Sequence, residues 1–184
     1  MKKIVLCLTV IMGLFMSANA ADQNKVVDKE NLLYLDVKYG RIIIQMLPEV
    51  APKTVARIKQ LVREKFYDGL KFHRVVPGFV VQGGDPTGTG MGGSGQNIPA
   101  EFDKNEHQTR GAVSMARAQD INSADSQFFI VLEDALFLDG QYTLWGRVIE
   151  GMDFVDMIKK GDPRSGTVTD PDIIVDMKLA SDEK

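Results

Sequence analysis

The sequence contains a single cysteine, Cys7, and only two histidines, His73 and His107, in 184 residues. Cys7 lies in an N-terminal apolar run that we expect to be cleaved, so the mature chain is predicted to carry no thiol. Neither histidine has a partner at the spacing of metal ligands, and no G-x-S-x-G nucleophile elbow occurs. We therefore expect no metal, no cofactor and no catalysis through a cysteine.

Neither sign of charge dominates the chain, because 22 Lys and Arg residues stand against 25 Asp and Glu residues. Removal of Lys2 and Lys3 with the N-terminal segment leaves 20 basic residues and a net charge of −5. Phosphate binding relies on clustered Lys and Arg side chains, and the sequence has no dense basic cluster. A nucleic-acid partner is therefore not expected.

Long apolar runs are also absent, except at the N-terminus. Two lysines precede the apolar run Ile4–Met16, and Ser17–Ala20 supplies small residues in an A-x-A pattern. This layout predicts a signal peptide over residues 1–20. The alternative, an uncleaved anchor, is disfavoured because the run is shorter than the roughly 20 residues that a bilayer requires. We expect an exported protein without membrane attachment, with the periplasm favoured over secretion.

The remaining chain has the size and composition of one globular domain. Residues 21–31 are polar and show no periodicity, so we interpret them as a flexible leader. The domain is expected to cover residues 32–180, followed by a short tail over residues 181–184. The sequence has no internal repeat, linker or oligomerisation signal, so a monomer is expected.

Short β-like segments dominate this domain. Leu32–Lys38 alternates and Arg41–Leu47 is rich in isoleucine, so the two segments predict a hairpin that turns at Tyr39–Gly40. Further strands are predicted at Lys71–Val75, Phe79–Gln82, Ala112–Met115, Gln127–Leu132, Thr143–Ile149 and Ile173–Leu179.

Two segments have helical spacing. One begins near Pro52, which suits a helix start, and its apolar residues are Val55, Ile58, Leu61 and Val62. The other is Asp153–Lys159, which ends before Gly161 and Pro163. Short strands, two helices and glycine-rich loops predict a mainly β fold, a closed or nearly closed antiparallel sheet with helices packed outside.

Glycine supplies seven of the thirteen residues of Gly83–Gly95. A phosphate-binding loop is one interpretation, but no Gly-Lys-Ser/Thr ending occurs and no helical pattern follows. The simpler interpretation is that the backbone needs close turns and positive φ, which glycine permits.

The segment Phe72–Asp85 places one arginine, Arg74, among apolar residues, with Phe79 and Gln82 following it. Taken alone, it predicts a strand pair with an arginine at its edge. In a strand over Ser126–Ile130, Gln127 and Phe129 share one face and Phe128 points to the other. One face is then core, and the other offers an aromatic wall beside a polar amide.

Together these residues resemble the cyclophilins. Phe72–Asp85 resembles the family's signature segment, and Ser114–Ala116 with Ser126–Ile130 resembles a second signature. Phe137–Gly140, Trp145–Val148 and Glu150–Met152 resemble later blocks. The match runs in order from about Leu32 to Leu179, and the Gln119–Asp125 loop with Arg117 is most similar to the bacterial, exported branch. The resemblance implies a closed antiparallel eight-stranded β-barrel capped by two α-helices.

The resemblance also implies peptidyl-prolyl cis/trans isomerase activity. Rotation about the peptide bond must overcome a barrier of about 18–20 kcal/mol, because C–N resonance is lost. No nucleophile or base is required, which fits their absence from the sequence. By resemblance, Arg74 is the catalytic residue and favours the twisted amide, whose nitrogen regains a lone pair. Gln82 is implied to bind the substrate backbone and to hold Arg74.

The remaining site residues follow from the same resemblance. Phe79, Phe129 and Leu138 match the proline pocket, with Val80 and Phe137 at its margin. Ala116 and Arg117 match the backbone that meets the residues before proline. Gln127 and Tyr142 match further wall positions, and His73 matches a supporting position beside the arginine.

Three residues depart from many relatives. Val80 replaces methionine and shortens the pocket wall, and Tyr142 replaces histidine. Phe137 replaces a tryptophan whose N–H can donate a hydrogen bond. We therefore expect weakened cyclosporin binding with isomerase activity retained.

The expected partners are proline-containing peptides and unfolded exported proteins. A second hypothesis is a peptide-binding module or chaperone that uses the same groove without catalysis, although binding alone would not need both Arg74 and Gln82. A structural barrel with no site is a third reading, disfavoured by the polar residues set among pocket aromatics.

Overall fold

The computed structural model describes residues 28–183. The predicted signal peptide over residues 1–20 and most of the expected leader lie outside these described residues. Within residues 28–183, no helix is both long enough and apolar enough to cross a bilayer.

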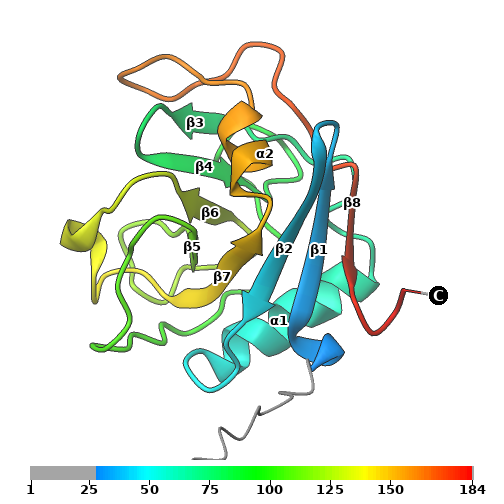
Figure 1. Ribbon diagram of the computed structural model, residues 1–184. Coiled ribbons are helices and arrows are strands. Elements are labelled where there is room, and N and C mark those ends of the chain that lie inside the picture. Colours follow the sequence, from blue (N-terminus) through cyan, green and yellow to red (C-terminus); the bar gives the residue numbers. More distant parts are fainter. Residues whose placement is uncertain (1–27, 184) are drawn as a thin grey trace, which may run out of the picture.

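Eight antiparallel strands form one sheet in the order β3-β4-β6-β5-β7-β2-β1-β8 (Figure 1). The sheet curls around a buried core, and all eight predicted strands are present. Their bounds are β1 Leu32–Val37, β2 Gly40–Met46, β3 Arg74–Val76, β4 Val80–Gly83, β5 Ala112–Met115, β6 Phe128–Val131, β7 Leu144–Glu150 and β8 Asp176–Leu179.

The sheet does not close into a complete barrel, so the prediction of a closed barrel is an overstatement. Its end strands, β3 and β8, are not paired in a ladder. The segments that precede them are joined only locally, for example by the isolated bridge between Lys71 and Ile173. The reason lies in residues 172–175, where Ile174 N donates to Leu70 O but Val175 N turns to Asp36 O, at 2.8 Å each. One short segment thus bonds to both sides and continues neither ladder.

Two α-helices, α1 (Pro52–Arg63) and α2 (Met152–Met157), lie at opposite ends of the curled sheet (Figure 1). α1 begins at Pro52 as predicted, and it buries the predicted apolar residues Val55, Ile58, Leu61 and Val62. α2 ends earlier than predicted because Ile158 leaves the helical conformation, with φ −56° and ψ 132°, and Asp172 accepts a hydrogen bond from Lys159 N at 2.9 Å. The mainly β fold with two helices is confirmed.

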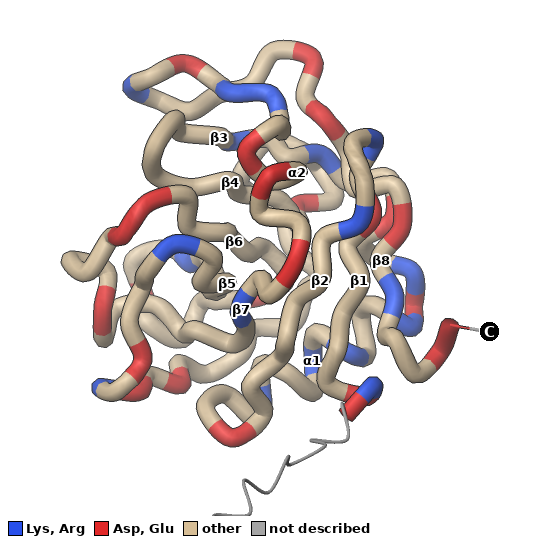
Figure 2. The backbone as a smooth tube through the Cα atoms, in the orientation of Figure 1, with Lys and Arg blue, Asp and Glu red and all other residues tan. Residues whose placement is uncertain are grey.

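The ends of the described chain are tied to the domain. Lys29–Asn31, within the expected leader, form the short 3-10 helix η1, capped by the Asp28 side chain. Arg63 pairs with Glu30 and with Asp182 of the expected tail, at 3.0 Å each. Lys and Arg positions are scattered among Asp and Glu positions along the backbone (Figure 2).

Apolar residues form two separate clusters because strand side chains alternate between faces. The interior cluster includes Val81, Phe128 and Ile130. The second cluster includes Val80, Phe129 and Leu138. β4 and β6 are therefore buried on both faces, and the second cluster forms the floor of the candidate site.

Candidate active site

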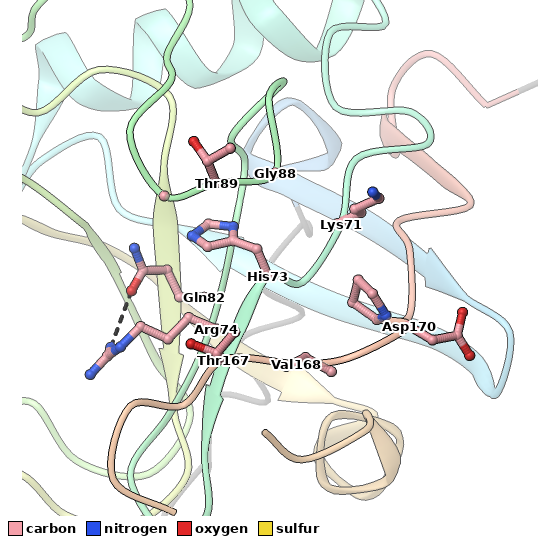
Figure 3. Close-up of a pocket in the computed structure, with 11 residues that line it drawn as sticks. Lys71, His73, Arg74, Gln82, Gly88, Thr89, Thr167, Val168 and Asp170 are labelled. Atoms are coloured by element: carbon pink, nitrogen blue, oxygen red, sulfur yellow. Dashed lines mark hydrogen bonds between the residues drawn. The ribbon is translucent and has the colours of Figure 1, made fainter. Parts of the chain in front are cut away.

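Arg74 and Gln82 stand opposite each other on the hairpin formed by β3 and β4. The turn contains Gly78 with φ 68°, a conformation that glycine adopts without strain. This register allows Arg74 Nη1 to donate a hydrogen bond to Gln82 Oε1 at 3.2 Å (Figure 3). The pair places one guanidinium and one amide beside the second apolar cluster.

Gln127 continues this hydrogen-bond chain. Gln82 Nε2 donates to Gln127 Oε1 at 2.9 Å. Gln127 Nε2 donates to the carbonyl oxygens of Gly90 and Gly92, at 3.0 and 2.8 Å. The glycine-rich loop therefore anchors the two glutamines, which in turn orient Arg74.

Asp85 holds the loop itself in place. Its carboxylate is 1% exposed and accepts hydrogen bonds from the backbone N–H groups of Thr87, Thr89, Gly90 and Gly92. Burial alone would raise the pKa of Asp85, but these bonds, with one from the Thr87 hydroxyl, outweigh burial and lower the pKa to about 2. A Cβ at position 92 would collide with the carboxylate, so Gly92 is required there.

A cavity of about 270 Å³ opens beside Arg74. Its lining residues are Arg74, Phe79, Val80, Gln82, Ala116, Arg117, Phe129, Leu138 and Tyr142. Nine of the twelve sequence-predicted site residues therefore meet at one apolar pocket with a polar rim. The rings of Phe129 and Tyr142 meet edge to face, with centroids 5.4 Å apart, and make one wall rigid.

Three predicted site residues lie outside this lining. Phe137 is 67% exposed, and its ring stacks on Phe79 with centroids 5.7 Å apart, so it extends the rim of the pocket. Gln127 lies behind Gln82 and lines a neighbouring cavity. His73 lines a different cavity, which also includes Arg74. Burial lowers the pKa of the His73 imidazole, although the charge of Asp85 acts in the opposite direction.

Arg117 is held by backbone carbonyl groups. Its guanidinium donates to the carbonyl oxygens of Gln141, Ala118 and Gln119 at 2.9 to 3.2 Å. The same group lies 5.0 Å over the ring of Tyr142. Arg117 thus ties the segment after β5 to the segment that carries the tyrosine wall.

Two further cavities adjoin the pocket and were missed by the sequence analysis. One, of about 340 Å³, includes Met91, Ser123 and Asp125 with Ala116 and Arg117. The other, of about 530 Å³, includes Lys71, Thr89 and Thr167 with Arg74. Gln82 lines all three cavities. The glycine-rich run was the available signal, because its backbone forms walls of both new cavities.

This arrangement suits noncovalent chemistry on a polar group that adjoins an apolar ring. The pocket holds the ring by apolar contact, and the guanidinium offers several fixed donors at its rim. Within residues 28–183, no group of three or more His, Cys, Asp or Glu side chains is placed to hold a metal ion.

Comparison with known proteins identifies the family to which this chain belongs. The family model described as cyclophilin type peptidyl-prolyl cis-trans isomerase/CLD matches residues 32–179. A probable peptidyl-prolyl cis-trans isomerase of Brucella suis biovar 1 is 45% identical over 182 residues, with 92% of each chain covered. Peptidyl-prolyl cis-trans isomerase B of Bacillus subtilis is 48% identical over 124 residues, which cover 67% of this chain and 86% of that protein.

Solved structures agree with these relatives. Cyclophilin AquaCyp293 from Hirschia baltica superimposes with a TM-score of 0.77 at 30% identity, covering 86% of this chain and 77% of that chain. A Cryptosporidium parvum cyclophilin-type peptidyl-prolyl cis-trans isomerase, crystallised in the presence of the dipeptide Ala-Pro, gives a TM-score of 0.74 at 29% identity. That match covers 80% of this chain and 98% of the other.

Proposed function

This chain belongs to the cyclophilin-type peptidyl-prolyl cis-trans isomerases and is an enzyme of that class; from this premise we propose that Arg74 is its catalytic residue and that its clients are exported proteins. The observation that carries the site assignment is the hydrogen bond of 3.2 Å from Arg74 to Gln82 at the rim of the apolar pocket.

The proline ring of the substrate occupies the pocket formed by Phe79, Phe129 and Leu138. This contact fixes one side of the peptide bond while the other side turns. As the bond twists, the prolyl nitrogen becomes pyramidal and regains a lone pair. A donor from Arg74 stabilises that lone pair more strongly than it stabilises the planar amide, so the interaction lowers the barrier.

The other site residues position the substrate. Gln82 bonds the substrate backbone while it holds Arg74, and the backbone at Ala116 and Arg117 meets the residues before proline. The walls of the pocket are completed by Val80, Gln127, Phe137 and Tyr142. His73, the residue before Arg74, supports the arginine. A monomer suffices, because one chain supplies every residue of this site.

Export is supported by the signal-peptide layout of residues 1–20. The enzyme then acts on unfolded proteins after they cross the membrane, in the periplasm or outside the cell. Proline isomerisation takes tens to hundreds of seconds without catalysis, slow enough to limit folding there. Cell fractionation of the full-length chain, compared with a chain that starts at Ala21, tests this step.

The decisive assay follows isomerisation of an Ala-Pro peptide with the wild type and Arg74→Ala. Acceleration by the wild type, with loss in the variant, supports the assignment, whereas a fully active variant refutes the role of Arg74. The peptide-binding alternative predicts instead that both proteins suppress aggregation of proline-free clients equally.

A further inference from the structure

The cavity of about 530 Å³ adjoins the proline pocket across Arg74 and Gln82, which line both (Figure 3). In Figure 3 the Arg74 side chain is directed toward Gln82, and Lys71 lies on the far side of His73. Because the two cavities share these walls, a peptide that occupies the proline pocket has this cavity beside it. Residues on one side of its proline therefore have room to enter.

The cavity on the opposite side of the proline pocket indicates whether the peptide residues that enter lie before or after the proline. The cavity of about 340 Å³ shares Ala116 and Arg117 with the proline pocket. The proposed function assigns this backbone to the residues before proline, and the present inference rests on that assignment. Neither residue lines the 530 Å³ cavity. Residues after the proline therefore pass Arg74 and approach Lys71.

Basic groups outnumber acidic groups in the lining of this cavity. Lys71 and Arg74 face one carboxylate, Asp170, whose side chain is 96% exposed and lies 3.5 Å from Lys159. The side chain of Lys71 is exposed, and it is not among the lysines that form ion pairs within residues 28–183, which are Lys38, Lys65, Lys159 and Lys178. The cavity therefore favours an anion.

His73 provides a second, independent sign of a ligand. It lines the cavity and is only 9% exposed, and neither ring nitrogen makes a hydrogen bond of standard geometry with the described residues, although the Lys71 backbone lies close enough to act on the imidazole. A buried polar group without a partner costs stability. Neutral imidazole offers one donor and one acceptor. Both ring nitrogens are covered in this structure, so the imidazole would have to turn toward the cavity for a carboxylate to accept its N–H and face the charge of Lys71.

We propose that this cavity is a specificity subsite that takes an acidic side chain located after the proline of a client peptide. Lys71 supplies the charge, and His73 supplies a buried donor. Thr89 and Thr167 line the same cavity, and the Thr89 hydroxyl is already hydrogen-bonded to Thr87 Oγ1. The subsite selects among clients, while rotation itself depends on Arg74.

The test compares peptides that carry glutamate or glutamine at the first, second or third position after an Ala-Pro pair. Titration calorimetry gives the dissociation constant of each peptide, and a parallel assay gives its isomerisation rate. One glutamate peptide is expected to bind about fivefold more tightly than its glutamine match, as for a partly exposed ion pair. The difference is expected to shrink at about 0.5 M salt, because the charges are screened. Binding should also shift the imidazole nitrogen resonances of His73.

Two charge-matched variants complete the design. Lys71→Gln is expected to abolish the preference for glutamate and to leave the affinity for the glutamine peptide unchanged. Lys53→Gln removes the same charge from α1, outside all three cavities, and is expected to keep the preference. The inference is wrong if no position after proline favours glutamate, or if the preference persists in Lys71→Gln. Failure to isomerise the glutamine peptide would instead refute the proposed function, and the binding comparison would still decide the subsite.

Discussion

Arg74 and Gln82 face each other across β3 and β4, and Arg74 Nη1 donates to Gln82 Oε1 at 3.2 Å. The amide of Gln82 also donates to Gln127, whose own amide donates to Gly90 and Gly92. An amide that accepts on one atom and donates on the other cannot rotate without breaking both bonds. The chain therefore orients the guanidinium before substrate binds, which is the condition for effective electrostatic stabilisation.

Replacement of Arg74 by lysine is expected to lower kcat/KM by about 100-fold, the typical effect of losing one preorganised donor. Lysine keeps the charge but lacks the planar fork that, in the proposed mechanism, bonds Gln82 and the substrate at the same time. A coupled peptide assay measures the loss, and circular dichroism checks that the fold is unchanged. A lysine variant with activity within about threefold of the wild type would contradict a geometric role for the guanidinium.

Asp85→Asn is expected to lower kcat/KM by roughly tenfold, although Asp85 lies outside the proline pocket. Asparagine keeps the size but offers one acceptor oxygen to donors that now share a carboxylate, and unsatisfied buried donors cost about 1–3 kcal/mol each. The loop would then hold Gln127 less firmly. Peptide kinetics and urea denaturation measure both effects.

Asp125→Asn is the matched control for this prediction. Asp125 also accepts backbone hydrogen bonds from the glycine-rich loop, at Ser94, Gly95 and Gln96. These residues do not carry the carbonyl groups that bind Gln127. We expect a comparable loss of stability with a smaller loss of activity. Equal losses of activity in both variants would show that the loop acts only through general stability.

The low pKa of Asp85, about 2, also predicts how stability depends on pH. The folded-state pKa lies below the ordinary value of about 3.9, so the ionised carboxylate stabilises the folded state above about pH 4. This contribution is lost as the pH falls from about 4 to 2, and a shift of this size corresponds to roughly 2 kcal/mol. Urea denaturation across this range should show a steeper loss for the wild type than for Asp85→Asn. Parallel curves would contradict the prediction.

The alternation of side chains made much of this site predictable from the sequence. The pattern Gln127-Phe128-Phe129 places Phe128 in the interior and Phe129 in the second cluster, as predicted. The resemblance to the cyclophilins supplied the order of the blocks and so brought Arg74 and Phe129 to one pocket. Both predictions depend on local periodicity or on long ordered motifs.

Other features depend on contacts that no local pattern encodes. The bond between Gln82 and Gln127 joins residues 45 positions apart, and it requires the register of β4 on β6. The incomplete closure of the sheet depends on how Ile174 and Val175 divide their bonds between Leu70 and Asp36. The glycine-rich run likewise indicated turns from its composition, but it did not indicate that the loop folds around the carboxylate of Asp85.

Phe137→Trp is expected to strengthen cyclosporin binding by roughly tenfold and to leave isomerase activity nearly unchanged. Phe137 is 67% exposed at the rim and stacks on Phe79, so a larger ring fits without displacing the buried floor of the pocket. The indole N–H adds a donor that phenylalanine lacks, and one such bond contributes about 0.5–1.5 kcal/mol, or up to about tenfold in affinity. Inhibition of peptide isomerisation by cyclosporin measures the change, and Leu136→Trp, at another exposed position of η2 (Leu136–Leu138), controls for added ring area. An equal gain in both variants would assign the effect to apolar area. No gain in Phe137→Trp would contradict the prediction that Phe137 limits cyclosporin binding.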